Sequence, residues 1–326
     1  MDFSERLQNI CDSYEEIKSQ MSQYSHSKDI FLLNPYKNSG NIRAKCNFHC
    51  HSNNSHDGIN TPTVLIDSYK KLGYDLVNLS DHTYLTKLDY NDLFYTMGAE
   101  PISDIGDYVL INVNQDNRDS CQSIISSRDT MQYKPLKDIC DIVHNNILLE
   151  GSLIAIAHPK WMGASQYINA DYDFYEIHNG YNREIVFNRV LASGKRCFII
   201  ADDDSHSIAY STAPKTIVLV NSKTKYAILD ALKKGQSYCE IGSSAPELNI
   251  KVDKNTISVT SNITCDIDFL YGDNGTEVGV IKYTIRGKNA TYTVPDNLPY
   301  IRVKAYNNKS TSTSSNYTLS QVFWRI

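Results

Sequence analysis

The stretch Phe48-His49-Cys50-His51-Ser52-Asn53-Asn54-Ser55-His56-Asp57-Gly58 places two imidazoles and a carboxylate where a predicted strand ends in a loop. Alternate side chains of a strand share a face, so His49 and His51 point the same way and Cys50 points to the opposite side. Imidazole nitrogens and carboxylate oxygens are ligands that Zn, Mn and Fe accept. With Asp57 following in the loop, the stretch predicts a metal site.

Three further apolar runs end in the same kinds of residues. Residues 77–80 lead to Asp81 and His82, residues 153–157 lead to His158, and residues 197–201 lead to Asp202, Asp203, Asp204 and His206. Each run is typical of a buried parallel strand that ends in polar residues. In barrels of alternating strands and helices, the active site forms at the C-terminal ends of the strands. The runs therefore predict one shared site.

Each of these residues also has a plainer interpretation. His-x-His occurs on ordinary strands, and a histidine after an apolar run is often a hydrogen-bonded residue at the rim. Asp81 is an ordinary turn former, and residues 202–204 would fit a solvated acidic turn. Three carboxylates at a buried rim would, however, repel one another unless cations compensated their charge.

Seven short motifs follow one another in the order typical of the PHP (polymerase and histidinol phosphatase) superfamily. They are His49-Cys50-His51, Asp57-Gly58, Ser80-Asp81-His82, Gly98-Ala99-Glu100, Ala157-His158-Pro159, Tyr175-Glu176-Ile177-His178-Asn179-Gly180 and Asp204-Ser205-His206. The chain resembles this superfamily over residues 42 to about 240. It is similar to the stand-alone metallo-phosphoesterase-like members with a C-terminal β-domain, a branch that includes a carbamate hydrolase. The resemblance implies a distorted seven-stranded (β/α) barrel with metal ions at its mouth.

The resemblance also implies which residues hold the metals. The first ion would be bound by His49, His51, Glu100 and Asp204, the second by Glu100 as a bridge and by His158, and the third by Asp57, His82 and His206. Two or three divalent ions, Zn, Mn or Fe, are therefore expected as cofactors.

Asp107 stands where many relatives supply a further histidine to the second metal. Carboxylates ligate the same metals, so Asp107 is expected as a harder ligand that favours Mn or Fe over Zn. The sequence leaves open that this second site is weak or empty. His56 reads equally well as a surface residue, and His178 as a hydrogen-bonding partner of a ligand.

Three further residues are expected to act in catalysis. Lys160 follows the motif at 157–159 and Arg183 follows the motif at 175–180, so both are candidate phosphate contacts. Each reads equally well as a solvated surface charge. Glu176 is expected either to orient a ligand histidine or to give a proton to the leaving alcohol. The sequence does not separate these two roles.

Composition limits the class of protein. The chain has 326 residues, of which 41% are hydrophobic and 21% charged, as is ordinary for a globular protein. A formal net charge of -5 disfavours a polyphosphate backbone, so nucleic acid is not expected as a partner. No apolar run is long enough for a membrane span, and the N-terminus lacks the features of a signal peptide. The eight cysteines form no Cys-x-x-Cys pair, which favours reduced thiols and a cytoplasmic location.

Three regions are predicted along the chain. Residues 1–41 form an N-terminal helical arm, since apolar residues recur there at intervals of three and four. Residues 42–245 form the α/β, PHP-like barrel. In residues 246–326 apolar and polar residues alternate in short segments, which predicts a small antiparallel β-sandwich domain.

Together these features predict a hydrolase of small phosphomonoesters or phosphodiesters, in which a metal-bridged hydroxide attacks phosphorus. The expected partner is a small phosphorylated substrate, with no membrane partner and with homo-oligomers left open. One alternative is a metal-dependent hydrolase of an ester, amide or carbamate, because activated hydroxide attacks carbon as well. The other is a metal-containing binding module without catalysis, which a weak second site at Asp107 would favour.

Overall fold

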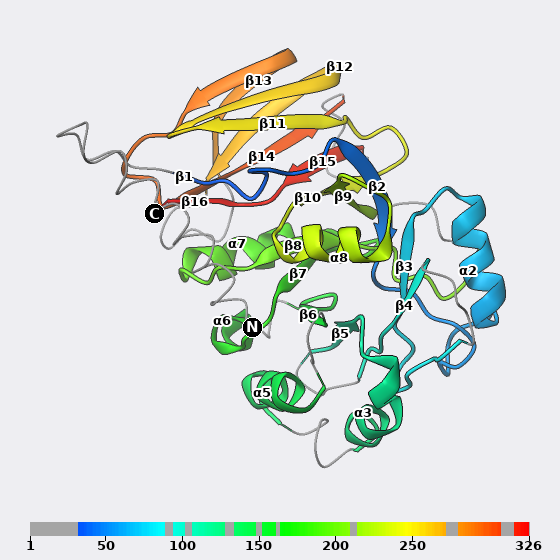
Figure 1. The fold of residues 1–326 in the computed structure, drawn as a ribbon. Helices are drawn as coiled ribbons and strands as arrows, with labels where there is room; N and C mark the ends of the chain where they lie inside the picture. Colours follow the sequence, from blue (N-terminus) through cyan, green and yellow to red (C-terminus); the bar gives the residue numbers. More distant parts are fainter. Residues whose placement is uncertain are drawn as a thin grey trace.

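Two β-sheets with helices around them make up the described part of the chain (Figure 1). The computed structural model describes residues 32–88, 94–101, 106–127, 134–147, 152–160, 164–208, 214–271, 280–307 and 316–325. The mixed α/β class that the sequence predicts is confirmed. Most of the predicted N-terminal arm, residues 1–31, lies outside the described residues.

The smaller sheet is fully buried. It consists of β5 (Tyr108–Ile111), β6 (Leu153–Ile156), β7 (Phe174–His178) and β8 (Phe198–Ala201), in this order. β6, β7 and β8 run parallel, whereas β5 runs antiparallel to β6. Every residue of these strands is buried, which explains why the sequence shows continuous apolar runs here.

The larger sheet follows the order β1-β16-β14-β15-β10-β9-β2-β3-β4, and β12 pairs with β11, β13 and β14. Its strands are β1 (Leu32–Leu33), β2 (Ile42–Asn47), β3 (Leu76–Leu79), β4 (Tyr95–Met97), β9 (Lys215–Val220), β10 (Ser237–Ile241), β11 (Leu248–Asp253), β12 (Thr256–Tyr271), β13 (Val280–Thr293), β14 (Tyr300–Tyr306), β15 (Tyr317–Ser320) and β16 (Phe323–Arg325). β2, β3 and β4 run parallel. The other pairings of this sheet are antiparallel.

The predicted seven-stranded barrel is not confirmed, because the described strands form two mixed sheets that do not close. Hydrogen bonds nevertheless connect the two sheets at two places. Beyond the end of β4, the Leu110 N–H donates to the carbonyl of Ala99 at 2.8 Å. Between β8 and β9, the Thr216 hydroxyl bonds to the backbone N–H and carbonyl of Ala201 at 3.0 and 2.9 Å. These contacts hold the ends of the parallel strands of both sheets close together.

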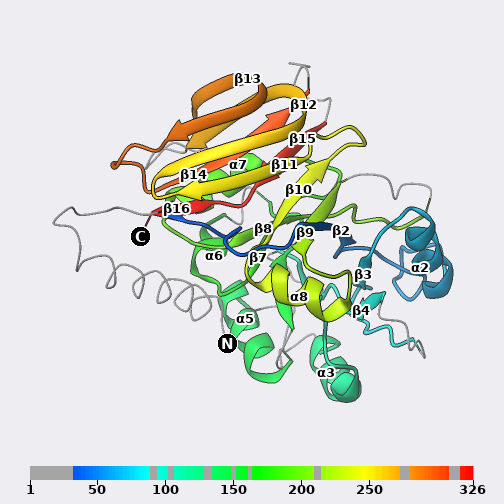
Figure 2. The ribbon, with the colours of Figure 1, turned by 45° about the horizontal axis from the view of Figure 1, so that its top comes forward.

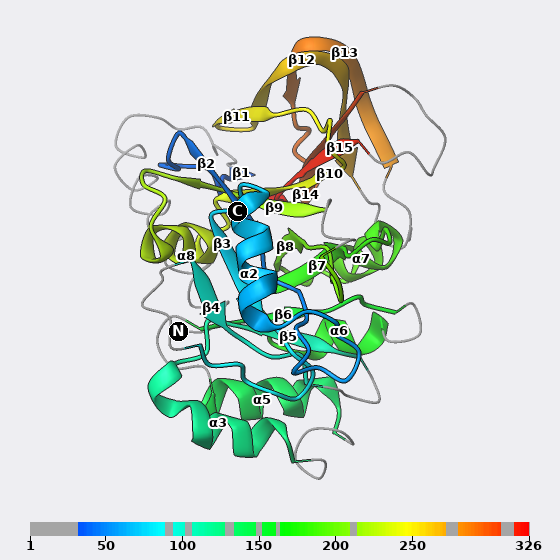
Figure 3. The same cartoon turned by 90° about the vertical axis from the view of Figure 1, so that its right-hand side faces the viewer.

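Helices lie around the two sheets. They are α2 (Pro62–Lys71), the 3-10 helix η1 (Gln115–Asn117), α3 (Arg118–Ile125), α5 (Leu136–Asn146), α6 (Ala164–Asn169), α7 (Glu184–Ala192) and α8 (Lys225–Lys233). α3 and α5 lie at the end of the molecule farthest from β12 and β13 (Figure 3). One face of α5 is buried, at Leu136, Ile139, Cys140 and Val143.

The start of α2 shows how the sequence sets a helix boundary. Thr61 precedes Pro62, and its side-chain oxygen accepts a hydrogen bond from the Val64 N–H at 3.4 Å. The substitution Thr61→Ala removes this acceptor and is expected to lower the free energy of unfolding by about 1 kcal/mol. Urea unfolding measures the difference, and Thr61→Ser, which keeps the hydroxyl, is the control. An unchanged value for the alanine variant would contradict a stabilising cap.

The C-terminal strands continue the larger sheet. β15 pairs with β10 on one side and with β14 on the other, so the sheet runs without a break across residue 246. Figure 2 shows β11, β12 and β13 as a layer next to β14 and β15. The division into residues 42–245 and a separate sandwich at 246–326 stays a prediction.

A buried ion cluster joins α7 to β14. The Glu184 carboxylate, at the first residue of α7, lies 2.6 Å from Lys304 Nζ and 3.5 Å from Arg302 NH2. The Arg302 side chain is 2% exposed and that of Glu184 is 11% exposed. Asn182 also donates to Glu184 at 2.9 Å. Charges on the C-terminal strands thus compensate a charge on the smaller-sheet side of the molecule.

Two further expectations bear on the described residues. Within them, no helix combines the length and apolar character needed to cross a membrane. Their seven cysteines are buried and free, in agreement with the reduced thiols that the sequence predicts. Burial raises the pKa of Cys197 to about 12, so this thiol stays protonated at neutral pH.

Candidate metal centre

The candidate residues meet at one edge of the two sheets. His49 follows β2, His82 follows β3, Glu100 follows β4, and His158 and Asp204 follow β6 and β8. Asp107 instead precedes a strand, β5. Because β5 runs antiparallel, its beginning lies opposite the end of β6, where Tyr108 pairs with Ile156. The reversed direction of one strand therefore brings Asp107 to the edge that the other residues share.

Backbone contacts tie the loops of this edge together. The Asp204 N–H donates to the carbonyl of His49 at 3.1 Å, and the His51 N–H donates to that of Ser205 at 2.9 Å. His158 and Asp204 have positive φ angles of 24° and 48°. Residues other than glycine rarely adopt such angles, and this strain is typical of functional sites.

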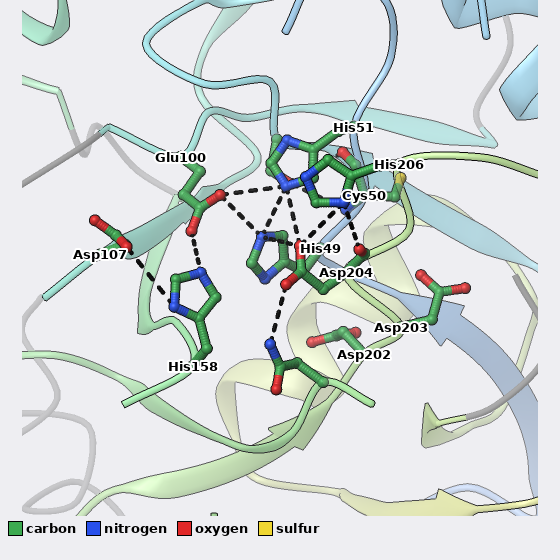
Figure 4. A network of polar contacts seen from close by, with 12 residues as sticks. His49, Cys50, His51, Glu100, Asp107, His158, Asp202, Asp203, Asp204 and His206 are labelled. Atoms are coloured by element: carbon green, nitrogen blue, oxygen red, sulfur yellow. Dashed lines mark hydrogen bonds and ion pairs between the residues drawn. The ribbon is translucent and has the colours of Figure 1, made fainter. Parts of the chain in front are cut away.

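The first group of side chains is His49, His51, Glu100 and Asp204 (Figure 4). The two Nε2 atoms of the histidines lie 3.1 Å apart. Each of these nitrogens lies 3.2 Å from Glu100 Oε2 and 3.2 Å from Asp204 Oδ1. Both histidines are completely buried. Four donor atoms from three separate segments of the chain thus point at one spot.

These distances fit a metal ion. The corners of a tetrahedron with edges of about 3.2 Å lie about 2.0 Å from its centre, which is the distance at which zinc takes nitrogen and oxygen ligands. Five distances among the four donor atoms are 3.1 or 3.2 Å. The donor set of two imidazoles and two carboxylates also suits Zn, Mn and Fe. The group can therefore hold a divalent cation.

The second group is His51, Asp57, His82 and His206. Asp57 Oδ2 lies 3.3 Å from His82 Nε2 and 3.1 Å from His206 Nε2. The buried Nδ1 atom of His82 makes no hydrogen bond among the described residues, and Glu100 Oε2 lies 3.3 Å from it. The sequence predicts Asp57, His82 and His206 together, but it does not predict that His51 belongs to this group as well as to the first.

The third group is Glu100, Asp107 and His158. His158 Nε2 lies 2.7 Å from Glu100 Oε1, while its Nδ1 lies 3.7 Å from Asp107 Oδ2 (Figure 4). Glu100 therefore belongs to two groups through its two oxygens, as the predicted bridge requires. Glu100 and Asp107 thus face different nitrogens of the His158 ring.

Glu176 contacts the centre from behind. Its Oε1 lies 2.8 Å from His49 Nδ1, and its Oε2 accepts the His158 backbone N–H at 2.5 Å. The side chain is 1% exposed. With both oxygens engaged and solvent excluded, the geometry favours the orienting role over that of a proton donor to a leaving group.

Charge balance determines the ionisation of the buried groups. Burial alone would raise the pKa of Glu100, but the charge of His49 and hydrogen bonds from His158, His49 and His51 lower it well below its usual range. Burial would likewise lower the pKa of His49, but the charges of Asp204, Glu100 and Glu176 raise it well above its usual range. The Glu100 carboxylate thus stays ionised, and its negative charge is balanced by positive charge on nearby protonated histidines or on bound cations.

The acidic run at residues 202–204 is not a solvated turn. Asp202 is buried, and burial together with the charge of Glu176 raises its pKa well above its usual range. Burial raises the pKa of Asp203 to about 7, although hydrogen bonds from Tyr69 and Asn47 oppose this. Of the three, Asp204 alone belongs to the metal-ligating groups of the described residues.

Two polar residues at the centre were missed by the sequence analysis. Asn179 donates from Nδ2 to Asp204 Oδ2 at 3.0 Å, and Ser55 Oγ lies 3.1 Å from His51 Nδ1. Both stand within or beside the motifs, yet serine and asparagine are common in loops and carry no signal of their own.

Other predicted residues lie apart from the three groups. Lys160 is exposed, and the guanidinium of Arg183 stacks on Tyr181 at 5.7 Å. His178 accepts the Gly180 N–H on Nδ1, and burial lowers its pKa to about 4. The structure brings none of Lys160, Arg183 and His178 into a ligating group of the described residues. The predicted phosphate contacts at Lys160 and Arg183 stay predictions.

Comparisons with known proteins give similar folds. No family model matches the chain, and no curated protein matches it. A two-domain protein containing a predicted PHP-like metal-dependent phosphoesterase from Bacteroides vulgatus matches with 15% identity and a TM-score of 0.48 over 87% of each chain. Endonuclease Q in complex with a 27-mer duplex substrate matches with 15% identity and a TM-score of 0.46, over 59% of this chain and 57% of that one. The lesion-specific endonuclease from Pyrococcus furiosus matches with 14% identity and a TM-score of 0.46, over 59% and 56%.

The PHP resemblance that the sequence indicates is thus found again among solved structures. At these identities and TM-scores the matches concern the fold and assign no activity to this chain. The prediction that nucleic acid is not a partner is wrong, because the similar structures include an endonuclease bound to duplex DNA. The physical reason is that a net charge of -5 describes the whole chain, whereas cations at one edge would set the local field.

Proposed function

We propose that this chain is a metal-dependent hydrolase of phosphoric esters. The observation that carries the proposal is the convergence of His49, His51, Glu100 and Asp204, whose donor atoms lie 3.1–3.2 Å apart. Such a set of two imidazoles and two carboxylates suits a divalent cation, whose charge would compensate the two carboxylates. The group of His51, Asp57, His82 and His206 would hold another cation.

Bound divalent cations would supply an activated water at neutral pH and would neutralise charge on the phosphoryl oxygens. Neighbouring residues hold the candidate ligand side chains in place by hydrogen bonds. Glu176 holds the ring of His49 through Nδ1, and Ser55 does the same for His51. Asn179 holds one oxygen of Asp204, so that the other oxygen faces the histidines. Such partners keep ligand orientations constant through turnover.

Exposure supports an entry side for the substrate. Three residues of the first group are buried and the Asp204 side chain is 17% exposed, whereas the side chains of Asp57 and His206 are 36% and 34% exposed. A phosphoryl group would therefore approach past Asp57 and His206. Arg183 is the residue proposed to bind, through its positive charge, the phosphoryl oxygens of the substrate that the cations do not contact. Its guanidinium stacks on Tyr181, and its buried Nε has no hydrogen-bond partner among the described residues.

Purified protein with Mn or Zn, offered a set of chromogenic and nucleic acid substrates, tests the proposal. The set is p-nitrophenyl phosphate, bis-p-nitrophenyl phosphate, a p-nitrophenyl carboxylic ester, and single-stranded and duplex DNA. We expect cleavage of a phosphoric ester, and loss of cleavage on addition of a chelator. Cleavage of the carboxylic ester alone would overturn the proposal in favour of a carbon-ester hydrolase. Inactivity on every substrate would favour a binding module.

A further inference from the structure

Three histidines of the centre share one orientation, whereas the Nδ1 atom of His82 faces Glu100 at 3.3 Å. In His49, His51 and His206 the Nε2 atom faces the ligating groups, and the Nδ1 atom faces an oxygen that lies behind the ring. That oxygen is Glu176 Oε1 at 2.8 Å for His49, Ser55 Oγ at 3.1 Å for His51, and the carbonyl of Asp204 at 2.9 Å for His206. An oxygen at Nδ1 fixes the proton there and leaves the Nε2 lone pair for a cation.

His158 fits the same pattern. Its Nε2 lies 2.7 Å from Glu100 Oε1, and its Nδ1 lies 3.7 Å from Asp107 Oδ2. Figure 4 shows that the two carboxylates face different nitrogens of the ring, Glu100 facing Nε2 and Asp107 facing Nδ1. Asp107 therefore takes the place that Glu176, Ser55 and the Asp204 carbonyl take at the other histidines.

We infer that Asp107 is a positioning residue for His158, and that it does not ligate a metal. This inference rests on the proposed function, since it concerns the same centre. The present 3.7 Å is longer than a hydrogen bond, and a movement of less than about 1 Å would form one. The backbone favours this role, because the Ala157 N–H donates to the Asp107 carbonyl at 3.0 Å and so fixes Asp107 beside His158.

The number of strongly held cations follows from this role. Without Asp107, the described residues of the third group offer only Glu100 Oε1 and His158 Nε2 to a cation. The other two groups offer seven residues between them, since His51 belongs to both, so that each still offers at least three to its cation. Two protein ligands hold a divalent ion more weakly than three or four do. The centre therefore binds two cations tightly and a further one weakly.

The full-length chain tests this with metal alone. Tightly bound metal is counted by plasma emission after dialysis, and the weaker equivalent is titrated with Mn²⁺, with the free ion followed by paramagnetic resonance. The variants are Asp107→Ala, which removes the acceptor, and Asp107→Asn, which keeps an acceptor oxygen but loses the charge. Asp119→Ala, at a side chain that is 94% exposed, is the control. In the Zn-loaded protein, nitrogen NMR of His158 reports which ring nitrogen carries the proton.

We expect two tight equivalents in all four proteins. Asp107→Ala should weaken the third equivalent by about ten- to a hundredfold, while Asp107→Asn should stay close to wild type. The proton of His158 should lie on Nδ1 in wild type and in Asp107→Asn. The inference is overturned if Asp107→Asn weakens binding as much as Asp107→Ala, if either variant loses a tight equivalent, or if neither has any effect. A wild-type chain that binds no metal would instead overturn the proposed function, and the inference with it.

Discussion

Glu100→Gln is expected to lower phosphoesterase activity by at least about a thousandfold, because it neutralises the carboxylate that belongs to two ligating groups. Glu100 Oε2 lies 3.2 Å from His49 and His51, and Oε1 lies 2.7 Å from His158. An amide keeps the shape but removes the charge that a cation needs. Cations supply several kcal/mol of charge stabilisation in such reactions, and about 1.4 kcal/mol corresponds to a tenfold change in rate.

Metal counts separate this explanation from misfolding. The variant should lose at least one tightly bound equivalent while its circular dichroism stays that of wild type. Glu247→Gln is the matched control, because that side chain is 52% exposed and belongs to none of the groups. Full activity of Glu100→Gln with an unchanged metal count would contradict the proposed centre.

The second large effect concerns stability. Glu184→Gln leaves the buried Arg302 and the partly buried Lys304 without a compensating carboxylate. Breaking a buried ion pair from one side costs about 3–5 kcal/mol, whereas exposed pairs contribute about 0–1 kcal/mol. Urea unfolding should show this loss at neutral pH. Asp141→Asn, which breaks the exposed pair with Lys137, is the control and should change stability little.

The loss should disappear in acid. Burial opposes ionisation of Glu184, but the charges of Lys304 and Arg302 lower its pKa from 4.5 to about 2. A lowered pKa stabilises the folded chain above pH 4.5, and this contribution is lost as the pH falls towards 2. The difference between the two pKa values corresponds to about 3 kcal/mol. A stability difference between wild type and Glu184→Gln that stays constant from pH 5 to 2 would contradict the assigned ionisation.

The candidate ligating residues could be predicted because two features of the sequence mark them. Each of His82, His158 and Asp204 stands within three residues of the end of a short apolar run, and the run and the polar residue together indicate the end of a buried strand. His49 and His51 share a face by strand periodicity. The arrangement of the site thus follows from local patterns, provided that the strands run parallel.

What the sequence did not predict depends on three-dimensional contacts. The direction of β5 decides on which side of His158 the Asp107 side chain lies, and no periodicity shows strand direction. Asn179 contacts Asp204, which is 25 residues away in the sequence. Ser55 contacts His51, but serine is common in any loop, so its presence alone indicates no role. The larger sheet passes residue 246 because β15 inserts between β10 and β14, a long-range pairing that local alternation cannot show.

The pairing of β15 with β10 also determines which edge of the larger sheet becomes exposed when the C-terminal strands are removed. β10 is buried throughout, with Tyr238 and Cys239 at its middle, and β15 covers one of its two sides. A product trimmed after residue 245 would present that side as a row of unpaired N–H and carbonyl groups beside apolar side chains. Such exposed edges recruit further strands from other molecules. The C-terminal strands thus protect the rest of the larger sheet, which carries part of the candidate metal centre, from aggregation through this edge.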